Sequence, residues 1–167
     1  MIKSFNSLLV TMFGLGKIRY MPGTFGSLAT VIILYHLFHT LNISPNIILF
    51  GLILIFIYSF YAVSSHIENS ENKDPGEIII DEFLGQSIPI YLYEISHGTT
   101  KDGGEAIVYY TLFFILFSYF GIMKPVPVNF FDKNFKNCFG VIMDDICAGF
   151  YVVLTLVCFM IIKSYVL

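Results

Sequence analysis

Asp81 and Glu82 are adjacent carboxylates inside an apolar run that ends at a glycine. The run reads Glu77-Ile-Ile-Ile-Asp-Glu-Phe-Leu-Gly85. Because an α-helix has about 3.6 residues per turn, Asp81 and Gly85 would share one helix face. The missing side chain at Gly85 would let another helix, or a bound head group, come close to this first acid pair.

A second acid pair, Asp144 and Asp145, repeats the arrangement towards the other end of the chain. Its segment reads Met143-Asp-Asp-Ile-Cys-Ala-Gly149, so Asp145 also has a glycine four residues later. Ionised carboxylates in apolar surroundings are costly unless they are paired or bound to a metal. One pair alone is equally well explained by acids that meet water at a helix start. Two such pairs in one short chain favour a divalent-cation site.

A turn-rich stretch, Met21-Pro-Gly-Thr-Phe-Gly-Ser27, comes directly before an apolar run. Pro22 and Gly23 interrupt regular structure, and Thr24 or Ser27 can cap the helix that follows. The free amides at a helix start, with hydroxyls beside them, suit an oxyanion such as phosphate. A plain helix cap needs no ligand, so this stretch by itself does not establish a phosphate site.

The composition is that of a membrane protein. Of the 167 residues, 56% are hydrophobic and only 13% are charged, which is too apolar for an ordinary soluble domain. The length predicts a single domain, residues 1–167. The net charge of −3 decides little, and no basic patch suggests a nucleic-acid partner.

Apolar segments separated by turns predict an all-α membrane protein, a bundle of about four to five apolar helices. The expected segments are residues 28–41, 47–64, 75–95, 106–123 and 146–162. Asp74-Pro75 is a helix-start signal, which places Asp81 and Glu82 in the second turn of the third segment. Pro89 is expected to kink that segment, and whether it crosses the membrane fully stays open.

Lysine and arginine are distributed unevenly along the chain, and this predicts an orientation. If the N-terminus is cytoplasmic and all five segments cross, the inner side holds Lys3, Lys17, Arg19, Lys73, Lys124, Lys133 and Lys136, and the outer side holds Lys101 and Lys163. Seven basic residues against two fit the positive-inside rule. Both acid pairs then lie at the cytoplasmic membrane edge. Charges gathered at an interface suit a substrate with a polar head in water and tails in lipid, whereas a transporter more often keeps them near mid-span.

Together these stretches resemble the phosphatidylglycerophosphatase A family of bacterial inner-membrane lipid phosphatases. The matching pieces are Pro22-Gly-Thr-Phe-Gly-Ser27, Ile80-Asp-Glu-Phe-Leu-Gly85, Lys124-Pro-Val-Pro127, Phe131-Asp132 and Gly140-Val-Ile-Met-Asp-Asp-Ile-Cys-Ala-Gly149. The resemblance implies Mg²⁺-dependent hydrolysis of phosphatidylglycerophosphate to phosphatidylglycerol and phosphate, a step of phospholipid biosynthesis. It also implies a multi-pass protein of the bacterial inner (cytoplasmic) membrane, whose active site would face the cytoplasm in the orientation given above.

The chain departs from this family just before Lys124. Where the family usually reads Phe-Arg-x-x-Asp, the sequence here reads Phe117-Ser-Tyr-Phe-Gly121, so Ser118 and Gly121 replace an arginine and an aspartate. The arginine would be a natural phosphate clamp, and the aspartate a metal ligand or base. Lys124 is therefore the strong cation left next to the proposed pocket, and the remaining acids suffice for one Mg²⁺.

Phosphomonoester hydrolysis requires the phosphate charge to be neutralised and a nucleophile to be held in line. Mg²⁺ typically takes one or two carboxylates, the substrate phosphate and waters. The predicted roles are Mg²⁺ ligands for Asp81, Asp144 and Asp145, a base or supporting group for Glu82, a phosphate contact for Lys124, and phosphate binding through amides or hydroxyls for Gly23, Thr24 and Ser27. Adjacent acids on a helix point about 100° apart, so one member of each pair can be purely structural. The attacking group, water or a carboxylate, and the oligomeric state stay open.

The rival hypothesis is a non-catalytic membrane scaffold or transport subunit whose acidic edge binds ions. The best support for it is the replacement of the family arginine and aspartate by Ser118 and Gly121. A phosphate-release assay with and without Mg²⁺ separates the two hypotheses.

Overall fold

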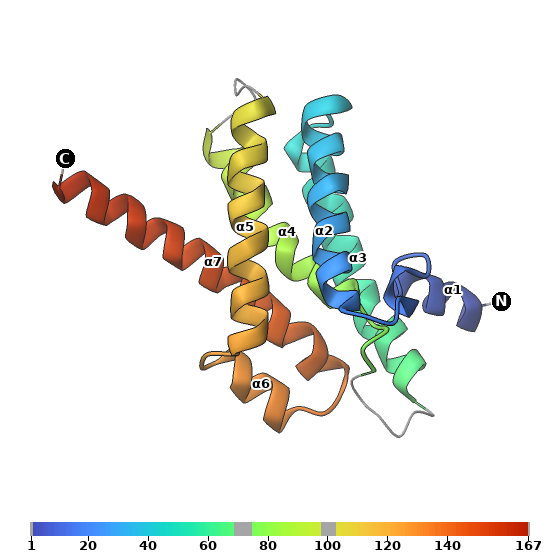
Figure 1. Ribbon diagram of the computed structural model, residues 1–167. Coiled ribbons are helices and arrows are strands. Elements are labelled where there is room, and N and C mark those ends of the chain that lie inside the picture. Colours follow the sequence, from blue (N-terminus) through green and yellow to red (C-terminus); the bar gives the residue numbers. More distant parts are fainter. Residues whose placement is uncertain (1, 69–74, 98–102, 167) are drawn as a thin grey trace.

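The computed structural model describes residues 2–68, 75–97 and 103–166, and every regular element in these ranges is a helix (Figure 1). This confirms the predicted all-α fold. Lys73, Asp74 and Lys101, which enter the predicted charge balance and helix start, lie outside the described residues.

Short connections join the helices along the chain. In order, the elements are α1 (Ile2–Val10), the 3₁₀ turn η1 (Leu15–Lys17), α2 (Pro22–Tyr35), its π-helical continuation η2 (His36–Thr40), α3 (Pro45–Ile67), α4 (Ile80–His97), α5 (Gly103–Met123), α6 (Val128–Asn134) and α7 (Cys138–Val166). The chain reverses direction between successive helices from α2 to α5, while α7 runs obliquely across the bundle and extends beyond it (Figure 1).

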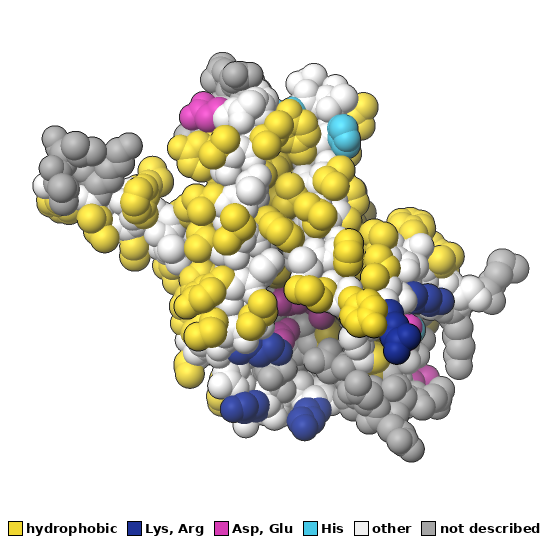
Figure 2. Space-filling view, viewed as in Figure 1, with side chains coloured by type: hydrophobic (Ala, Val, Ile, Leu, Met, Phe, Trp, Pro, Cys, Tyr) yellow, Lys and Arg dark blue, Asp and Glu magenta, His cyan; other side chains and the backbone are white. Residues whose placement is uncertain are grey.

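Among the described residues, three helices are long and apolar enough to cross a membrane: α3, α5 and the Cys138–Ile162 part of α7. Only 22%, 22% and 17% of their apolar stretches are buried inside the protein. Most of these side chains therefore face outward, and Figure 2 shows the broad apolar surface that results. Such a surface belongs in lipid. α2 has 14 residues and α4 has 18, and neither helix belongs to this set, although the sequence predicted a crossing for each of them.

The first acid pair lies nearer to a helix start than the sequence predicted. α4 begins at Ile80 and not at Pro75. The intervening residues form a turn and an extended stretch, in which the N–H of Ile79 donates to the carbonyl of Val10 at 2.9 Å. This bond ties the segment to the end of α1 and prevents a helical pairing there. The first acid pair consequently lies in the first turn of α4, where the helix dipole favours negative charge.

α2 also begins earlier than predicted, at Pro22, directly after Met21. No side chain caps it, so the predicted cap by Thr24 or Ser27 is wrong. Both residues lie inside the helix, and Ser27 Oγ donates to the Gly23 carbonyl at 3.0 Å. Proline suits the first helical position because its φ is preset and it has no N–H to leave unpaired.

α7 begins at Cys138, whereas the sequence predicted a start near residue 146. Asn137 Oδ1 accepts hydrogen bonds from the N–H groups of Phe139 and Gly140, both at 3.1 Å. An asparagine in this position caps a helix and fixes where it starts. The second acid pair therefore lies inside α7, about two turns from its beginning.

α4 lies at the centre of the bundle and packs against α2, α3, α5 and α7. It continues through Pro89 as one helix. One buried apolar cluster joins the start of α4 to α1, α3 and the start of α7. A second cluster joins the rest of α4 to α2, α5 and the middle of α7. Polar side chains on α4 are therefore enclosed by other helices.

A polar contact joins three helices at the end of α4 that is remote from the acid pairs. Glu94, which is 5% exposed, accepts a hydrogen bond from the Tyr110 hydroxyl of α5 at 2.9 Å through Oε1. The same oxygen lies 3.1 Å from His39 Nε2 in η2. This contact fixes the far ends of α2, α4 and α5 relative to one another. Because the first apolar cluster packs around the start of α4, the helix is held at both of its ends.

Candidate active site

The backbones of α4 and α7 meet at two glycines, Gly85 and Gly149. A Cβ atom at Gly85 would overlap the carbonyl of Asp145, and one at Gly149 would overlap the carbonyl of Gly85. The prediction that Gly85 admits another helix is confirmed, and that helix is α7. The close approach brings the two acid pairs together.

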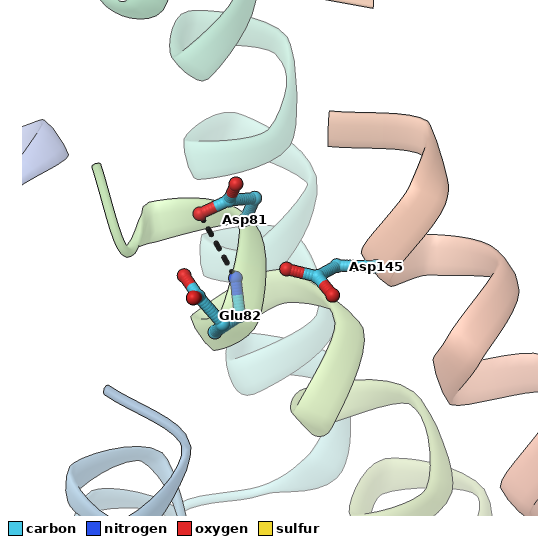
Figure 3. Close-up of side chains that lie close together, drawn as sticks. All are labelled: Asp81, Glu82 and Asp145. Carbon is cyan, nitrogen blue, oxygen red and sulfur yellow. Dashed lines mark hydrogen bonds between the residues drawn. The ribbon is translucent and has the colours of Figure 1, made fainter. Parts of the chain in front are cut away.

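Three carboxylates converge beside this crossing (Figure 3). Asp81, Glu82 and Asp145 each offer one oxygen, and these oxygens lie within 4.8 Å of one another. Asp81 is only 6% exposed. Carboxylates this close repel unless a proton or a cation neutralises them. The arrangement is thus one that a divalent cation would stabilise.

The two acid pairs share one local geometry. The N–H of Glu82 donates to Asp81 Oδ1 at 3.1 Å, and the N–H of Asp145 donates to Asp144 Oδ1 at 2.9 Å. In each pair the first acid is therefore held by the backbone of the second. This bond fixes the rotamer of the first acid and orients the pair as a unit.

Lys124 and Asp144 form an ion pair at this end of the bundle. Lys124 Nζ donates to Asp144 Oδ2 at 3.1 Å, and the lysine side chain is 33% exposed. Lys124 directly follows α5 and has a φ of 42°, which non-glycine residues rarely adopt. The sequence predicted Asp144 as a metal ligand, but the structure places it against Lys124 and outside the group of three converging carboxylates.

The start of α2 lies against Glu82. A Cβ atom at Gly23 would overlap Glu82 Oε1, so a glycine is needed to leave room for this carboxylate. Gly23 and Thr24 belong to the first turn of α2, whose N–H groups have no partner inside the helix. Ser27 lies about one turn further along. The predicted phosphate-binding stretch thus adjoins the carboxylates, and Gly23 touches one of them.

Glu82 lies in surroundings that oppose the negative charge of its carboxylate. Its Oε2 atom is buried and, among the described residues, has no hydrogen-bond partner. Burial, followed by the charge of Asp145, raises the pKa of Glu82 to about 8, against the opposing effect of a hydrogen bond with Asp81. An acid with a buried, unpaired oxygen is costly, and a bound cation would satisfy that oxygen. The sequence had given Glu82 only a base or supporting role, because spacing does not reveal which acid of a pair turns inward.

Comparison with known proteins bears directly on this arrangement. A family model described as phosphatidylglycerophosphatase A matches residues 8–160. The chain belongs to the phosphatidylglycerophosphatase A family. The matched range contains the start of α2, both acid pairs and Lys124, so family membership covers the whole candidate site.

Individual relatives match over most of their own length. A phosphatidylglycerophosphatase A of Haemophilus influenzae is 33% identical over 147 residues, which cover 88% of this chain and 83% of the relative. A putative phosphatidylinositol-3-phosphatase of Bacteroides thetaiotaomicron is 31% identical, with 86% of each chain covered. A phosphatidylglycerophosphatase A of Escherichia coli is 27% identical, with 85% of this chain and 76% of the relative covered. No solved structure gives a significant match.

Two positions at which the chain departs from the phosphatidylglycerophosphatase A pattern lie on α5. Ser118 Oγ is buried and has no hydrogen-bond partner within the described part of the chain. A Cβ atom at Gly121 would meet no atom within 4 Å. The ring of Phe117, which precedes Ser118, would lie 2.8 Å from a Cβ at Gly85. α5 therefore adjoins the helix crossing, although the arginine and aspartate usual in the family are absent from it.

Proposed function

We propose that the protein hydrolyses phosphatidylglycerophosphate to phosphatidylglycerol and inorganic phosphate and that it requires Mg²⁺. As a member of its family the chain is a phosphoric monoester hydrolase. The observation that carries the proposal is the convergence of Asp81, Glu82 and Asp145 at the α4–α7 crossing. Two of the matched relatives are named for phosphatidylglycerophosphate and one for a phosphorylated phosphatidylinositol, so each name describes a lipid phosphomonoester.

The three converging carboxylates fit a Mg²⁺ ion. Their donor atoms are all oxygens, which hard divalent cations prefer. The buried, unpaired Oε2 of Glu82 supports the same assignment, because this atom has no partner among the described residues. Asp81, Glu82 and Asp145 are thus the proposed ligands, in place of the set that included Asp144. When bound, the ion would supply positive charge against the phosphate that is being transferred.

Groups of the protein would contact the phosphate on the sides that the metal ion leaves open. Lys124 is a strong donor for charge-assisted phosphate contacts, and Asp144 keeps its ammonium group in position. The first-turn N–H groups of Gly23 and Thr24 add uncharged donors where a helix dipole favours an anion. These contacts would orient the phosphate, which is the main task of a protein in phosphoryl transfer.

We also propose a location in the bacterial inner membrane, with the acidic end of the bundle in the cytoplasm. The seven-to-two distribution of basic residues, which counts α2 and α4 as further crossings beside the three long apolar helices, supports this orientation. The described parts of α4 and α5 run in opposite directions (Figure 1), so this pair of helices returns the chain to the acidic end. A lipid substrate could then present its phosphate at that end while its tails stay in the bilayer.

The direct test is phosphate release by the purified protein in mixed micelles that contain phosphatidylglycerophosphate. We expect release with Mg²⁺, none after chelation with EDTA, and recovery when Mg²⁺ is restored. Phosphate release that persists in EDTA would contradict the metal requirement. The absence of release under every condition would favour the rival hypothesis of a non-catalytic scaffold or transport subunit.

A further inference from the structure

Gln86 is a fully buried polar residue that the mechanism above leaves without a role. Its exposed fraction is 0%, and neither Nε2 nor Oε1 of its amide has a hydrogen-bond partner among the described residues. Buried side-chain amides are nearly always hydrogen-bonded, because an unpaired donor and acceptor lose their water without compensation. An unpaired amide in the centre of an apolar bundle therefore calls for an explanation.

The position of Gln86 connects it to the candidate active site. It follows Glu82 by four residues, so the two side chains lie on the same face of α4. That face meets α2, because Gly23 of α2 lies against the Glu82 carboxylate. Both Glu82 Oε2 and the Gln86 amide are buried and unpaired within the described ranges. Helical spacing therefore places these two polar groups one above the other along α4, from its acidic end into the bundle.

Neighbouring hydroxyls on α2 and α4 already donate hydrogen bonds. On α2, Ser27 Oγ donates to the Gly23 carbonyl, and Thr30 Oγ1 donates to the Gly26 carbonyl at 2.8 Å. On α4, Ser87 Oγ donates to the Phe83 carbonyl at 2.6 Å. Each of these buried hydroxyls gives its proton to its own helix, whereas the Gln86 amide has no such bond. The difference sets Gln86 apart from these three hydroxyl residues.

We propose that Gln86 determines substrate specificity by binding the free hydroxyl of the alcohol that carries the scissile phosphate. The inference rests on the proposed function and extends it to the rest of the headgroup. An amide offers one acceptor and two donors, so it can accept the proton of a hydroxyl and donate to its oxygen. The headgroup glycerol of phosphatidylglycerophosphate has one such free hydroxyl, between its terminal phosphate and its phosphodiester.

The dimensions and charges favour this part of the substrate. Four residues of helix advance about 6 Å, so Gln86 lies about that far from Glu82 towards the membrane interior. A lipid whose terminal phosphate is held by Lys124 and the first-turn N–H groups of α2 would place its alcohol on the tail side of that phosphate. A second phosphate group is a poorer match for Gln86, because the amide is neutral and Glu82 lies one turn away. A neutral hydroxyl matches both the chemistry and the depth.

The test compares two lipids that differ in this hydroxyl alone. One is phosphatidylglycerophosphate, and the other carries a 1,3-propanediol phosphate headgroup in place of glycerol phosphate. We expect the wild-type protein to prefer the natural lipid by about 10- to 100-fold in kcat/KM, since a site built for a hydroxyl discriminates against its absence. In Gln86→Met the preference should fall to near unity, because kcat/KM for the natural lipid should decrease. The lipid-free variant should unfold at the same or a higher temperature, because the substitution removes an unpaired amide at similar volume.

Ser87→Ala is the matched control, since it alters the adjacent buried polar residue whose hydroxyl is already paired. It should leave the preference between the two lipids unchanged. Equal losses on both lipids in Gln86→Met, or a wild-type protein that does not discriminate, would overturn the inference. A wild-type protein that releases phosphate from neither lipid would instead refute the proposed function.

A second measurement does not depend on how the variant folds. Glycerol 3-phosphate and 3-hydroxypropyl phosphate differ in the same hydroxyl and are soluble competitors for the wild-type site. We expect glycerol 3-phosphate to inhibit at about tenfold lower concentration, as one hydrogen-bonded hydroxyl implies. Equal inhibition by the two compounds would overturn the inference even if Gln86→Met cannot be purified.

Discussion

The ammonium nitrogen of Lys124 lies 3.1 Å from Oδ2 of Asp144, so the end of α5 is joined to α7 next to the converging carboxylates. In the proposed site, this ion pair makes Asp144 a partner of Lys124 instead of a metal ligand. In the proposed site Asp144 holds the lysine in position, and the lysine ammonium group would contact the phosphate. Because Ser118 stands where the family usually has an arginine, we expect the contribution of Lys124 to be larger.

Lys124→Met should therefore be unusually damaging. One charge-assisted phosphate contact contributes about 1.5–3 kcal/mol, which corresponds to a loss of about 10- to 150-fold in kcat/KM for phosphate release. Lys133→Met, at an exposed position of α6, is the control and should stay near wild type. If Lys124→Met also stays near wild type, Lys124 serves only to anchor the end of α5.

Asp81→Asn and Asp145→Asn should each abolish Mg²⁺-dependent phosphate release while the protein stays folded. Each variant removes the charge of one proposed ligand and keeps its shape. Loss of a major transition-state charge stabiliser costs about 100-fold or more. The matched control is Glu105→Gln, an exposed acid in the first turn of α5, which should keep its activity. A variant at position 81 or 145 with normal turnover would remove that residue from the proposed site.

The stability of the metal-free protein should depend on Glu82 ionisation. The pKa of Glu82 is raised from 4.5 to about 8 by burial and by Asp145, so between these values the folded state holds more protons than the unfolded state. Stability should then fall as the pH rises through this window, by at most about 1.4 kcal/mol per pH unit. Thermal unfolding in EDTA across the window measures the slope.

Two comparisons isolate the contribution of Glu82. In Glu82→Gln the part of the slope that this carboxyl causes should disappear. Saturating Mg²⁺ should reduce the slope in the wild-type protein, because a bound cation takes the place of the proton. A slope that is the same in all three samples would show that other groups cause it.

Gly85→Ala should separate α4 from α7. The added methyl group would overlap the Asp145 carbonyl, and overpacking of this kind costs about 1–3 kcal/mol. Thermal unfolding should show the loss, and phosphate release should fall because Asp145 moves away from Asp81. Gly51→Ala on α3 is the control, since a Cβ there meets nothing within 4 Å. An unchanged Gly85→Ala variant would mean that the crossing does not set the carboxylate spacing.

Topology is open to a direct test with reporter fusions after Glu68, at the end of α3, and after Phe135, at the end of α6. We expect both fusions to report a cytoplasmic location. In the proposed orientation α4 crosses the membrane to the outer side, and α5 crosses it back to the cytoplasmic side. Fusions on opposite sides would show that α4 does not cross and that the proposed orientation of the acidic end needs revision.

The glycines at which the two acid pairs meet were predictable because the spacing from acid to glycine is local. A glycine one helical turn after an acid marks both Asp81 and Asp145, and the structure makes those glycines the contact point of α4 and α7. The apolar segments likewise identified the long helices, since burial in lipid demands continuous apolar runs. The acid-to-glycine spacing and the apolar runs are local features of the sequence, so they could be read without knowledge of the tertiary packing.

Other features depend on partners far away in the sequence. Pro75 is a strong local signal for a helix start, yet the bond from Ile79 to Val10 delays α4. Adjacent acids point in different directions on a helix, so only the packed orientation of α7 shows that Asp145 faces the site while Asp144 binds Lys124. The cap at Asn137 had a readable signal, because asparagine is a preferred cap residue.

Pro89 gives the helix crossing a property of its own. Proline has no N–H, and in a regular α-helix residue 89 would supply the donor for the carbonyl of residue 85. That carbonyl of Gly85 is the atom that lies against Gly149 of α7, where a Cα–H group can serve as a weak donor. Because Pro89 cannot donate to this carbonyl, the carbonyl is available for a weak contact with the backbone of α7. Since this contact joins backbone to backbone, no change of a side-chain rotamer can loosen it.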